Sequence, residues 1–229
     1  MKNPIFEISN LVYSKKNITL MSIKNFEVHR GACYIISGNM ASGKTLLLNL
    51  LSKNDKKYNG EIFYESKLLT TYSKKAFNKN VFYVKQDYYP PYFKTVSNYL
   101  NESLTNNSSE KNKTNIIDKI VSKMDCKYLM NTKMRDLTPS QLRWVNLAAG
   151  IIAFPKVLLI DELELHLSLN NIKNIIKILY RKSNYEGITI IATTQNKDFF
   201  KNLSSVNINI NHGRITSVRS SVKKKYNKK

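Results

Sequence analysis

The sequence contains few cysteines and no long apolar segment. Its two cysteines, Cys33 and Cys126, form no CxxC pair, which excludes a disulfide-stabilised framework. The longest apolar run covers residues 147–154, eight residues where a membrane-spanning helix needs about 20. The N-terminus lacks the apolar segment of a signal peptide. With 42% hydrophobic residues the chain can still bury a sizeable core, so we expect a soluble, intracellular protein.

Acidic residues are also scarce. The chain has 16 Asp and Glu and 37 Lys and Arg, which gives a formal net charge of +21. Such a charge is typical of proteins that bind nucleic acid or an anionic membrane surface. Only six of these cations are arginine, although bidentate recognition of phosphates and base edges favours arginine. Compositional drift of an AT-rich coding sequence also explains a lysine excess, so three interpretations stay open. Residues 219–229 hold six cations and no acid, which predicts a flexible basic tail that anionic lipid would attract.

Apolar residues follow the periods of strands and helices in alternation. Alternation near the N-terminus predicts two antiparallel strands, and later continuous runs predict strands buried in a parallel sheet. Predicted strands cover residues 5–11, 18–28, 33–36, 61–64, 81–85, 157–160, 188–193, 206–210 and 214–218. Predicted helices cover residues 45–51, 118–130, 140–154 and 172–179, and a polar loop covers residues 101–113. We therefore expect an α/β fold in a single domain over residues 1–229, with a mainly parallel sheet, an N-terminal antiparallel β-subdomain and an inserted helical subdomain at about 90–145.

A phosphate-binding pattern lies between a buried strand and a helix. The pattern GxxxxGK[ST] is matched by Gly38, Asn39, Met40, Ala41, Ser42, Gly43, Lys44 and Thr45. In such a P-loop, backbone N–H groups and the N-terminus of the helix point at the phosphates. Lys44 would reach the β- and γ-phosphates, and the Thr45 hydroxyl would hold Mg²⁺. Ala41 stands where many such loops have a third glycine. The pattern predicts a P-loop NTPase core that binds a nucleotide.

Two carboxylates follow the apolar run at residues 157–160. A strand buried on both faces delivers its terminal carboxylate to the carboxyl edge of the sheet, so Asp161 would bind Mg²⁺ through water. Glu162 would orient and polarise the attacking water as a general base. Their position downstream of a P-loop in an α/β chain predicts hydrolysis of the bound nucleotide.

On these motifs the chain resembles the nucleotide-binding domain of ABC-type ATPases over essentially its whole length. The resemblance implies ATP and Mg²⁺ as ligands. It also implies that Tyr13 stacks on adenine, that Gln86 contacts Mg²⁺ and the attacking water, and that Gln195 replaces the switch histidine. The family signature LSGGQ is matched by Leu137, Thr138, Pro139, Ser140 and Gln141, of which Thr138, Ser140 and Gln141 are expected to contact ATP.

The departures from the family pattern fall on the surface that faces a second subunit. In ABC proteins two domains pair head to tail, and each signature completes the ATP site of its partner. Pro139 replaces the first glycine and has no N–H, and Ser140 replaces the second. Loss of one N–H aimed at developing charge costs about 10²–10³ in rate, so we expect ATP binding with slow hydrolysis. Gln195 cannot gain a proton as histidine does. Ser168 stands where a dimer-crossing aspartate is expected, and His166 is either a substitute acid or merely exposed.

The expected function is that of the ATP-binding subunit of a membrane ABC complex, cytoplasmic and peripheral on the inner face of the membrane. Its partners would be an integral membrane subunit in a separate chain and a second ATPase, either a copy of itself or another subunit. The aromatic segment at residues 86–100 would dock on the membrane subunit or pack against the helical subdomain. Two alternatives stay open. One is a non-hydrolysing regulatory clamp. The other is a soluble ATPase acting on nucleic acid, and the short chain and its lysine excess disfavour this second alternative. A weak similarity to cell-division and lipoprotein-release subunits identifies no substrate.

Overall fold

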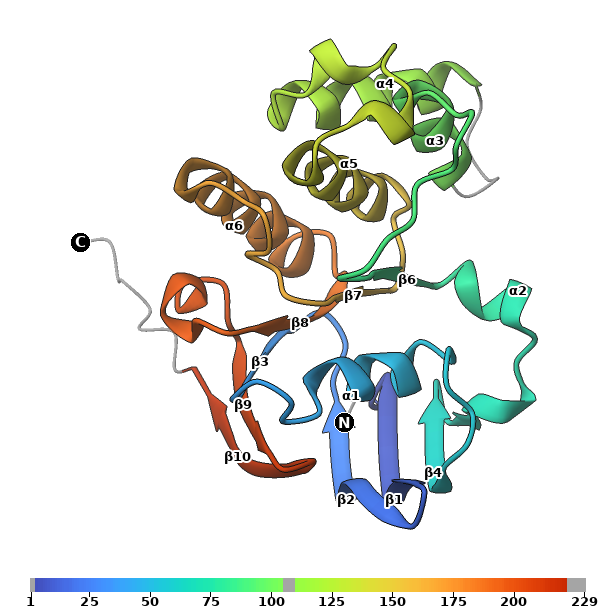
Figure 1. Cartoon of the computed structure of the whole chain (residues 1–229), viewed down its shortest axis with the longest axis vertical. Coiled ribbons are helices and arrows are strands. Elements are labelled where there is room, and N and C mark those ends of the chain that lie inside the picture. Colours follow the sequence, from blue (N-terminus) through green and yellow to red (C-terminus); the bar gives the residue numbers. More distant parts are fainter. Residues whose placement is uncertain (1–2, 105–109, 222–229) are drawn as a thin grey trace.

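The protein, here a computed structural model that describes residues 3–104 and 110–221, contains two β-sheets and a layer of helices (Figure 1). The larger sheet has six strands in the order β10-β9-β3-β8-β7-β6. Five of them are parallel, and only β10 is antiparallel to its neighbour β9. The strands are β3 (Cys33–Ser37), β6 (Val81–Val84), β7 (Val157–Ile160), β8 (Thr189–Thr194), β9 (Val206–Asn211) and β10 (Arg214–Ser220). The predicted α/β fold with a mainly parallel sheet is confirmed.

The smaller sheet is antiparallel and contains the N-terminal strands. Its order is β2-β1-β4-β5, with β1 (Phe6–Lys15), β2 (Ile18–Val28), β4 (Asn59–Tyr64) and β5 (Lys67–Leu68). Ile8 of β1 pairs with Phe26 of β2 and Ile62 of β4, and all three are buried. The predicted antiparallel β-subdomain is therefore confirmed.

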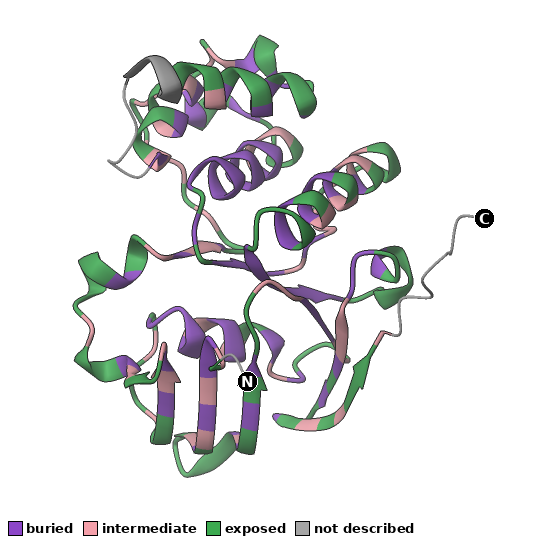
Figure 2. Cartoon of the chain, turned by 180° about the vertical axis from the view of Figure 1, so that it is seen from behind, coloured by how far each residue is buried: buried purple, intermediate pink, exposed green. Residues whose placement is uncertain are grey.

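Helix α1 (Lys44–Leu51) lies between the two sheets (Figure 1), and its leucines pack with Ile36 of β3 and Met21 of β2. The opposite face of the six-stranded sheet is covered by α5 (Pro139–Ile152) and α6 (Leu169–Asn184), which pack with Ile35. Figure 2 shows that α5 is buried along most of its length. Because β3 alternates its side chains between two covered faces, both sides of the sheet must be apolar, and the continuous apolar runs predicted such burial.

The chain between β6 and β7 is largely helical. It contains α3 (Val96–Ser103), α4 (Glu110–Lys123), η2 (Lys127–Leu129), η3 (Met134–Asp136) and α5. Two short helices, η1 (Leu69–Thr71) and α2 (Lys74–Asn78), precede β6, and η4 (Lys197–Phe200) follows β8. Helices α3 and α4 pack on α5 in one buried cluster. The division into one domain with an inserted subdomain at 90–145 stays a prediction. Within the described residues, no helix has both the length and the apolar character that crossing a bilayer requires.

Three local predictions are wrong or reach beyond the described residues. The helix predicted at 118–130 spans Glu110–Lys123. Its first six residues are polar and carry no apolar periodicity that would predict a helix, and Asp125, at φ +49°, turns the chain out of the helix at the other end. The polar loop predicted at 101–113 is partly helical, since α3 ends at Ser103 and α4 begins at Glu110, and residues 105–109 lie outside the described residues. Arg219 belongs to β10, so the predicted tail does not begin there, and residues 222–229 also lie outside the described residues.

Candidate functional site

The P-loop connects β3 to α1 and holds its lysine against its own backbone. The Lys44 ammonium donates hydrogen bonds to the carbonyl oxygens of Gly38 at 2.7 Å and Asn39 at 2.8 Å. Lys44 is 7% exposed, and the buried hydroxyl of Ser42 has no hydrogen-bond partner among the described residues. A cation, an unpaired hydroxyl and the N-terminus of α1 thus lie in one short loop. This combination fits a polyphosphate.

Backbone crowding explains two residues of this loop. A Cβ on Gly38 would lie 2.1 Å from the carbonyl oxygen of Ile210, so only glycine fits beneath the β9–β10 hairpin. Ala41 has φ +59°, a left-handed conformation that costs a residue with a Cβ about 1–2 kcal/mol. The alanine noted in the sequence is thus sterically accommodated, but with strain. The exposed members of the predicted loop are Asn39, Met40, Ala41 and Thr45.

A buried carboxylate lies at the same edge of the sheet as the P-loop. Asp161 follows β7 and is fully buried, and the Thr193 hydroxyl of neighbouring β8 donates to its Oδ1 at 2.6 Å. The same hydroxyl accepts the backbone N–H of Glu162 at 2.7 Å. The other carboxylate oxygen of Asp161 has the Tyr83 hydroxyl at 3.5 Å, and burial together with this carboxylate raises the pKa of Tyr83. One oxygen of a buried carboxylate is therefore weakly paired, which suits a hydrated cation.

Glu162 is held by the glutamine predicted at the switch position. Gln195 Nε2 donates to Glu162 Oε1 at 2.7 Å, although the two residues come from different loops. Glu164 accepts hydrogen bonds from the segment that contains Gln195. Its Oε1 accepts the Thr194 hydroxyl at 2.7 Å, the Gln195 N–H at 2.7 Å and the Asn196 N–H at 3.2 Å. Glu164 thereby positions Gln195, and Gln195 positions the Glu162 carboxylate.

Arg143 of α5 connects three segments around these carboxylates. Its guanidinium donates to the carbonyl oxygens of Lys85 at 2.9 Å, Asp161 at 2.5 Å and Glu162 at 2.8 Å. Burial lowers the pKa of Arg143 to about 10, and the neighbouring carboxylates act in the opposite direction, so the side chain stays charged at neutral pH. The ends of β6 and β7 are therefore tied to the helix that follows the signature.

Gln86 lines a surface cavity next to Arg143. It is exposed directly after Lys85, and the cavity, of about 280 Å³, is also lined by Pro139 and His166. Three segments that are distant in the sequence, at residues 86, 139–143 and 166, thus border one space. His166 is exposed and lines this cavity, so both of its interpretations stay open.

The signature begins helix α5 rather than forming an open glycine loop. The Thr138 hydroxyl accepts the Gln141 N–H at 3.3 Å, and Gln141 Oε1 accepts the Thr138 N–H at 3.0 Å, which is a capping box. Pro139 occupies the first helical position, where its missing N–H leaves no hydrogen bond broken. Proline and serine thus replace the two glycines of the family signature, and the segment stabilises the N-terminus of α5 instead. Thr138 and Ser140 remain exposed.

Tyr13, the predicted adenine contact, lies in β1 and is half-buried. Its hydroxyl donates to Asp55 Oδ2 at 2.8 Å, and this hydrogen bond raises the pKa of Tyr13. Asp55 belongs to the loop that follows α1, so the tyrosine is held near the end of the P-loop helix. The hydrogen bond holds the tyrosine by its hydroxyl, and the side chain remains partly exposed to solvent.

Comparison with known proteins assigns the family. The family model described as ABC transporter matches residues 21–164. This chain belongs to the ABC transporter family. It is 27% identical over 210 residues to the methionine import ATP-binding protein MetN of Chlamydia pneumoniae, which covers 89% of this chain and 62% of MetN. It is 23% identical over 198 residues to the lipoprotein-releasing system ATP-binding protein LolD of Francisella tularensis, covering 84% of this chain and 86% of LolD.

Solved ABC cassettes share the fold. The dimeric bacterial ABC transporter cassette MJ0796 superposes with a TM-score of 0.84 at 16% identity, covering 95% of this chain and 99% of that one. The chain is thus an ABC transporter-type ATPase by family and a P-loop NTPase by fold. It spans 62% of the length of MetN, so the activity and partners of the whole MetN protein do not transfer to it directly.

In this ABC cassette the signature and the P-loop belong to opposite layers. Helix α5, which Thr138 caps, packs on one face of the six-stranded sheet, and α1, which the P-loop begins, packs on the other. The predicted nucleotide contacts from residues 138–141 therefore come from a different layer than those from residues 38–45.

Three residues of the site escaped sequence reasoning: Glu164, Arg143 and Thr193. Glu164 is visible in the sequence only as an acid two residues after Glu162, and its partner Gln195 lies 31 residues away, so its role carries no local signal. Arg143 follows the signature within a helix that was expected, and its three acceptors are backbone carbonyls, which carry no sequence signal. Thr193 is one of several β-branched residues in a buried strand.

Proposed function

We propose that this chain is the ATP-binding subunit of a membrane ABC complex, and that it binds and slowly hydrolyses ATP to drive a conformational change in a separate membrane subunit. The observation that carries this proposal is the arrangement at the carboxyl edge of the sheet. There the P-loop with Lys44, the buried Asp161 and the paired Glu162 lie at the ends of the nearby strands β3 and β7, which flank β8.

ATP would bind through its phosphates on the P-loop and its adenine on the Tyr13 ring. Lys44 would exchange the carbonyls of Gly38 and Asn39 for phosphate oxygens, which are better partners because they carry charge. Mg²⁺ would be held by Thr45 and Gln86 and, through water, by Asp161, and it would neutralise phosphate charge there. The weakly paired Asp161 oxygen supports this assignment.

Hydrolysis would depend on Glu162 as the group that orients and deprotonates water. The hydrogen bond from Gln195 occupies Oε1 and leaves Oε2 as an acceptor, so the glutamine fixes the rotation of the carboxylate. Gln195 does not titrate, and the pH dependence of the rate would lack the step that a histidine adds at this position.

The signature supports slow turnover in a head-to-tail dimer. Thr138, Ser140 and Gln141 would contact the γ-phosphate of a partner subunit, which is either a second copy of this chain or a different ABC ATPase. Pro139 supplies no N–H to that phosphate, and the Thr138 oxygen already accepts a hydrogen bond from its own helix. A non-hydrolysing clamp is the second candidate, and this same pair of observations favours it.

Contact with an integral membrane subunit would use the aromatic residues after Gln86. Tyr89 is 90% and Phe93 is 82% exposed, and the Arg135 guanidinium lies 4.3 Å from the Tyr92 ring. Tyr99 instead is half-buried, with its hydroxyl 2.9 Å from Asn146 Oδ1, so the segment divides into a docking part and a packed part. Such a contact would place the chain in the cytoplasm, peripheral on the inner face of the membrane.

The decisive experiment measures single-turnover ATP hydrolysis by the purified chain and by Glu162→Gln. The variant keeps an oxygen that can accept from Gln195 but lacks a basic carboxylate, so turnover should disappear while ATP affinity persists. Tight ATP binding without any turnover in the unmodified chain would overturn the hydrolysis proposal and favour the clamp. Salt-dependent RNA or DNA binding that stimulates turnover would favour the nucleic-acid alternative.

A further inference from the structure

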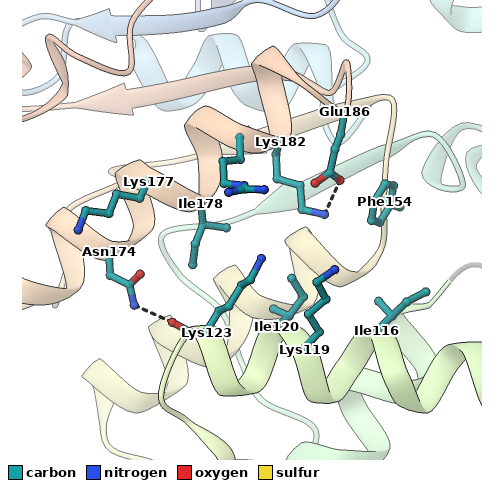
Figure 3. A pocket seen from close by; sticks show the side chains of 11 residues that line it. Ile116, Lys119, Ile120, Lys123, Phe154, Asn174, Lys177, Ile178, Lys182 and Glu186 are labelled. Carbon is teal, nitrogen blue, oxygen red and sulfur yellow. Dashed lines mark hydrogen bonds and ion pairs between the residues drawn. The ribbon is translucent and has the colours of Figure 1, made fainter.

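A groove between α4 and α6 lies on the helical layer, apart from the ATP site. It has a volume of about 530 Å³, within the range of about 300–1,000 Å³ typical of small-molecule sites. Asn174 Nδ2 of α6 donates to the Lys123 carbonyl oxygen at 2.9 Å and ties the two helices together at one end. Phe154 lies at the other end, and Figure 3 shows the lining side chains between the two helices.

The rim of this groove is strongly cationic. Its lining contains one carboxylate, Glu186, and five cations: Lys119, Lys123, Lys177, Arg181 and Lys182. Figure 3 shows Lys119 and Lys123 pointing from α4 toward Lys182 and Glu186. One carboxylate cannot compensate so many neighbouring cations, and the groove therefore has a positive potential that an anion would relieve.

One of these cations is buried. Lys182 is 6% exposed, donates to Glu186 Oε2 at 2.7 Å, and lies 3.8 Å from the centroid of the Phe154 ring. Burial lowers the pKa of Lys182, and the ammonium groups of Lys123 and Lys119 lower it further, while Glu186 opposes them. A buried ammonium among like charges is a costly arrangement, which is understandable where a ligand supplies further negative charge.

The floor of the groove is apolar. Ile120 and Ile178 are buried and Ile116 is partly buried, while Phe154 is 51% exposed. Free inorganic phosphate would contact the rim only, and the backbone of a nucleic acid would leave these side chains unused. An apolar floor below a cationic rim matches a molecule with an apolar body and an acidic end.

We propose that the groove between α4 and α6 binds a small anionic amphiphile, an acyl or aryl body with a terminal carboxylate or phosphate. The acidic end lies among Lys119, Lys123 and Lys182, and the body lies on Ile120, Ile178 and the ring of Phe154. The site does not depend on nucleotide, because none of its residues belongs to the P-loop or its carboxylates.

The test is calorimetric titration of the full chain, without nucleotide, with decanoate below its micellar concentration. Decanol and inorganic phosphate serve as probes of the body and of the charge alone. We expect saturable binding of one decanoate per chain, and binding at least about tenfold weaker for each of the other two probes. Phosphate that binds as tightly as decanoate would overturn the amphiphile assignment.

Paired variants locate the site. Lys119→Gln with Lys123→Gln removes two exposed cations of the rim and should weaken decanoate binding about tenfold. Lys127→Gln with Lys173→Gln removes the same charge from exposed positions outside the lining, and it should leave binding unchanged. Equal effects of both pairs would overturn the proposal.

Two further outcomes separate this site from other functions of the chain. Lys44→Ala should bind decanoate as tightly as the unmodified chain does. The assignment of the groove therefore stands or falls independently of the ATP assignment. If anionic vesicles bind through Lys119 and Lys123 while monomeric decanoate does not compete, the groove is a membrane-contact surface and the small-ligand proposal is wrong.

Discussion

Glu164 determines where Gln195 lies, and Glu164→Ala tests whether that position matters for hydrolysis. The substitution removes the acceptor of three hydrogen bonds, from the Thr194 hydroxyl and from the N–H groups of Gln195 and Asn196. Gln195 would then lose the backbone anchor that presents its amide to Glu162. We expect a slower chemical step with an unchanged nucleotide affinity, because Lys44 and the P-loop are not touched.

The expected loss in the free energy of unfolding depends on which of these three donors are buried. The Thr194 side chain is fully buried, and a buried hydroxyl left without its acceptor costs about 1–3 kcal/mol. The two N–H groups belong to exposed residues and can bond water instead. We therefore expect the free energy of unfolding to fall by about 2 kcal/mol. The single-turnover rate should fall by about 10- to 100-fold, the range that misplacement of a reacting group by about 1 Å produces.

The assay combines single-turnover hydrolysis, equilibrium ATP binding and denaturant unfolding. Glu61→Ala removes an exposed acid from β4 and should change none of the three quantities. Glu164→Gln keeps an oxygen acceptor and should lie between the two alanine variants. Because Glu164 acts through Gln195, adding Glu164→Ala to Gln195→Ala should slow hydrolysis no further. A Glu164→Ala rate equal to that of the unmodified chain, or a parallel loss of ATP affinity, would refute this reasoning.

Further substitutions test the loop and the signature. Lys44→Ala should weaken ATP binding about 100-fold or more in equilibrium titrations, and retained affinity would contradict the phosphate assignment. Ala41→Gly should raise the free energy of unfolding by about 0.5–1 kcal/mol because it relieves a positive φ, whereas Ala76→Gly in α2 should lower it by a similar amount. Pro139→Gly combined with Ser140→Gly should raise the turnover number, because the first restores an N–H donor to the phosphate and the second removes a Cβ beside it; an unchanged or lower rate would count against an impaired signature.

The strands and the P-loop could be predicted because their signals are local. Period-two alternation in β1 and β2 and continuous apolar runs in β7 and β8 are readable within about ten residues. The boundaries of α4 were less accessible, because residues 110–115 at its start are polar and the end of the helix depends on the left-handed Asp125. Polar helix surface and loop have similar compositions, so the expected polar loop concealed the first turns of α4.

By itself the sequence determined the fold class, the family resemblance and the candidate catalytic residues, since these depend on residue types at short, regular spacings. Only the tertiary structure decided that Glu164 anchors Gln195, 31 residues away, and that Arg143 reaches the Lys85 carbonyl across 58 residues. It alone assembled a cationic groove from α4 and α6. The physical reason is that such contacts arise when strands pair and helices pack, and their partners are often backbone atoms that every residue has.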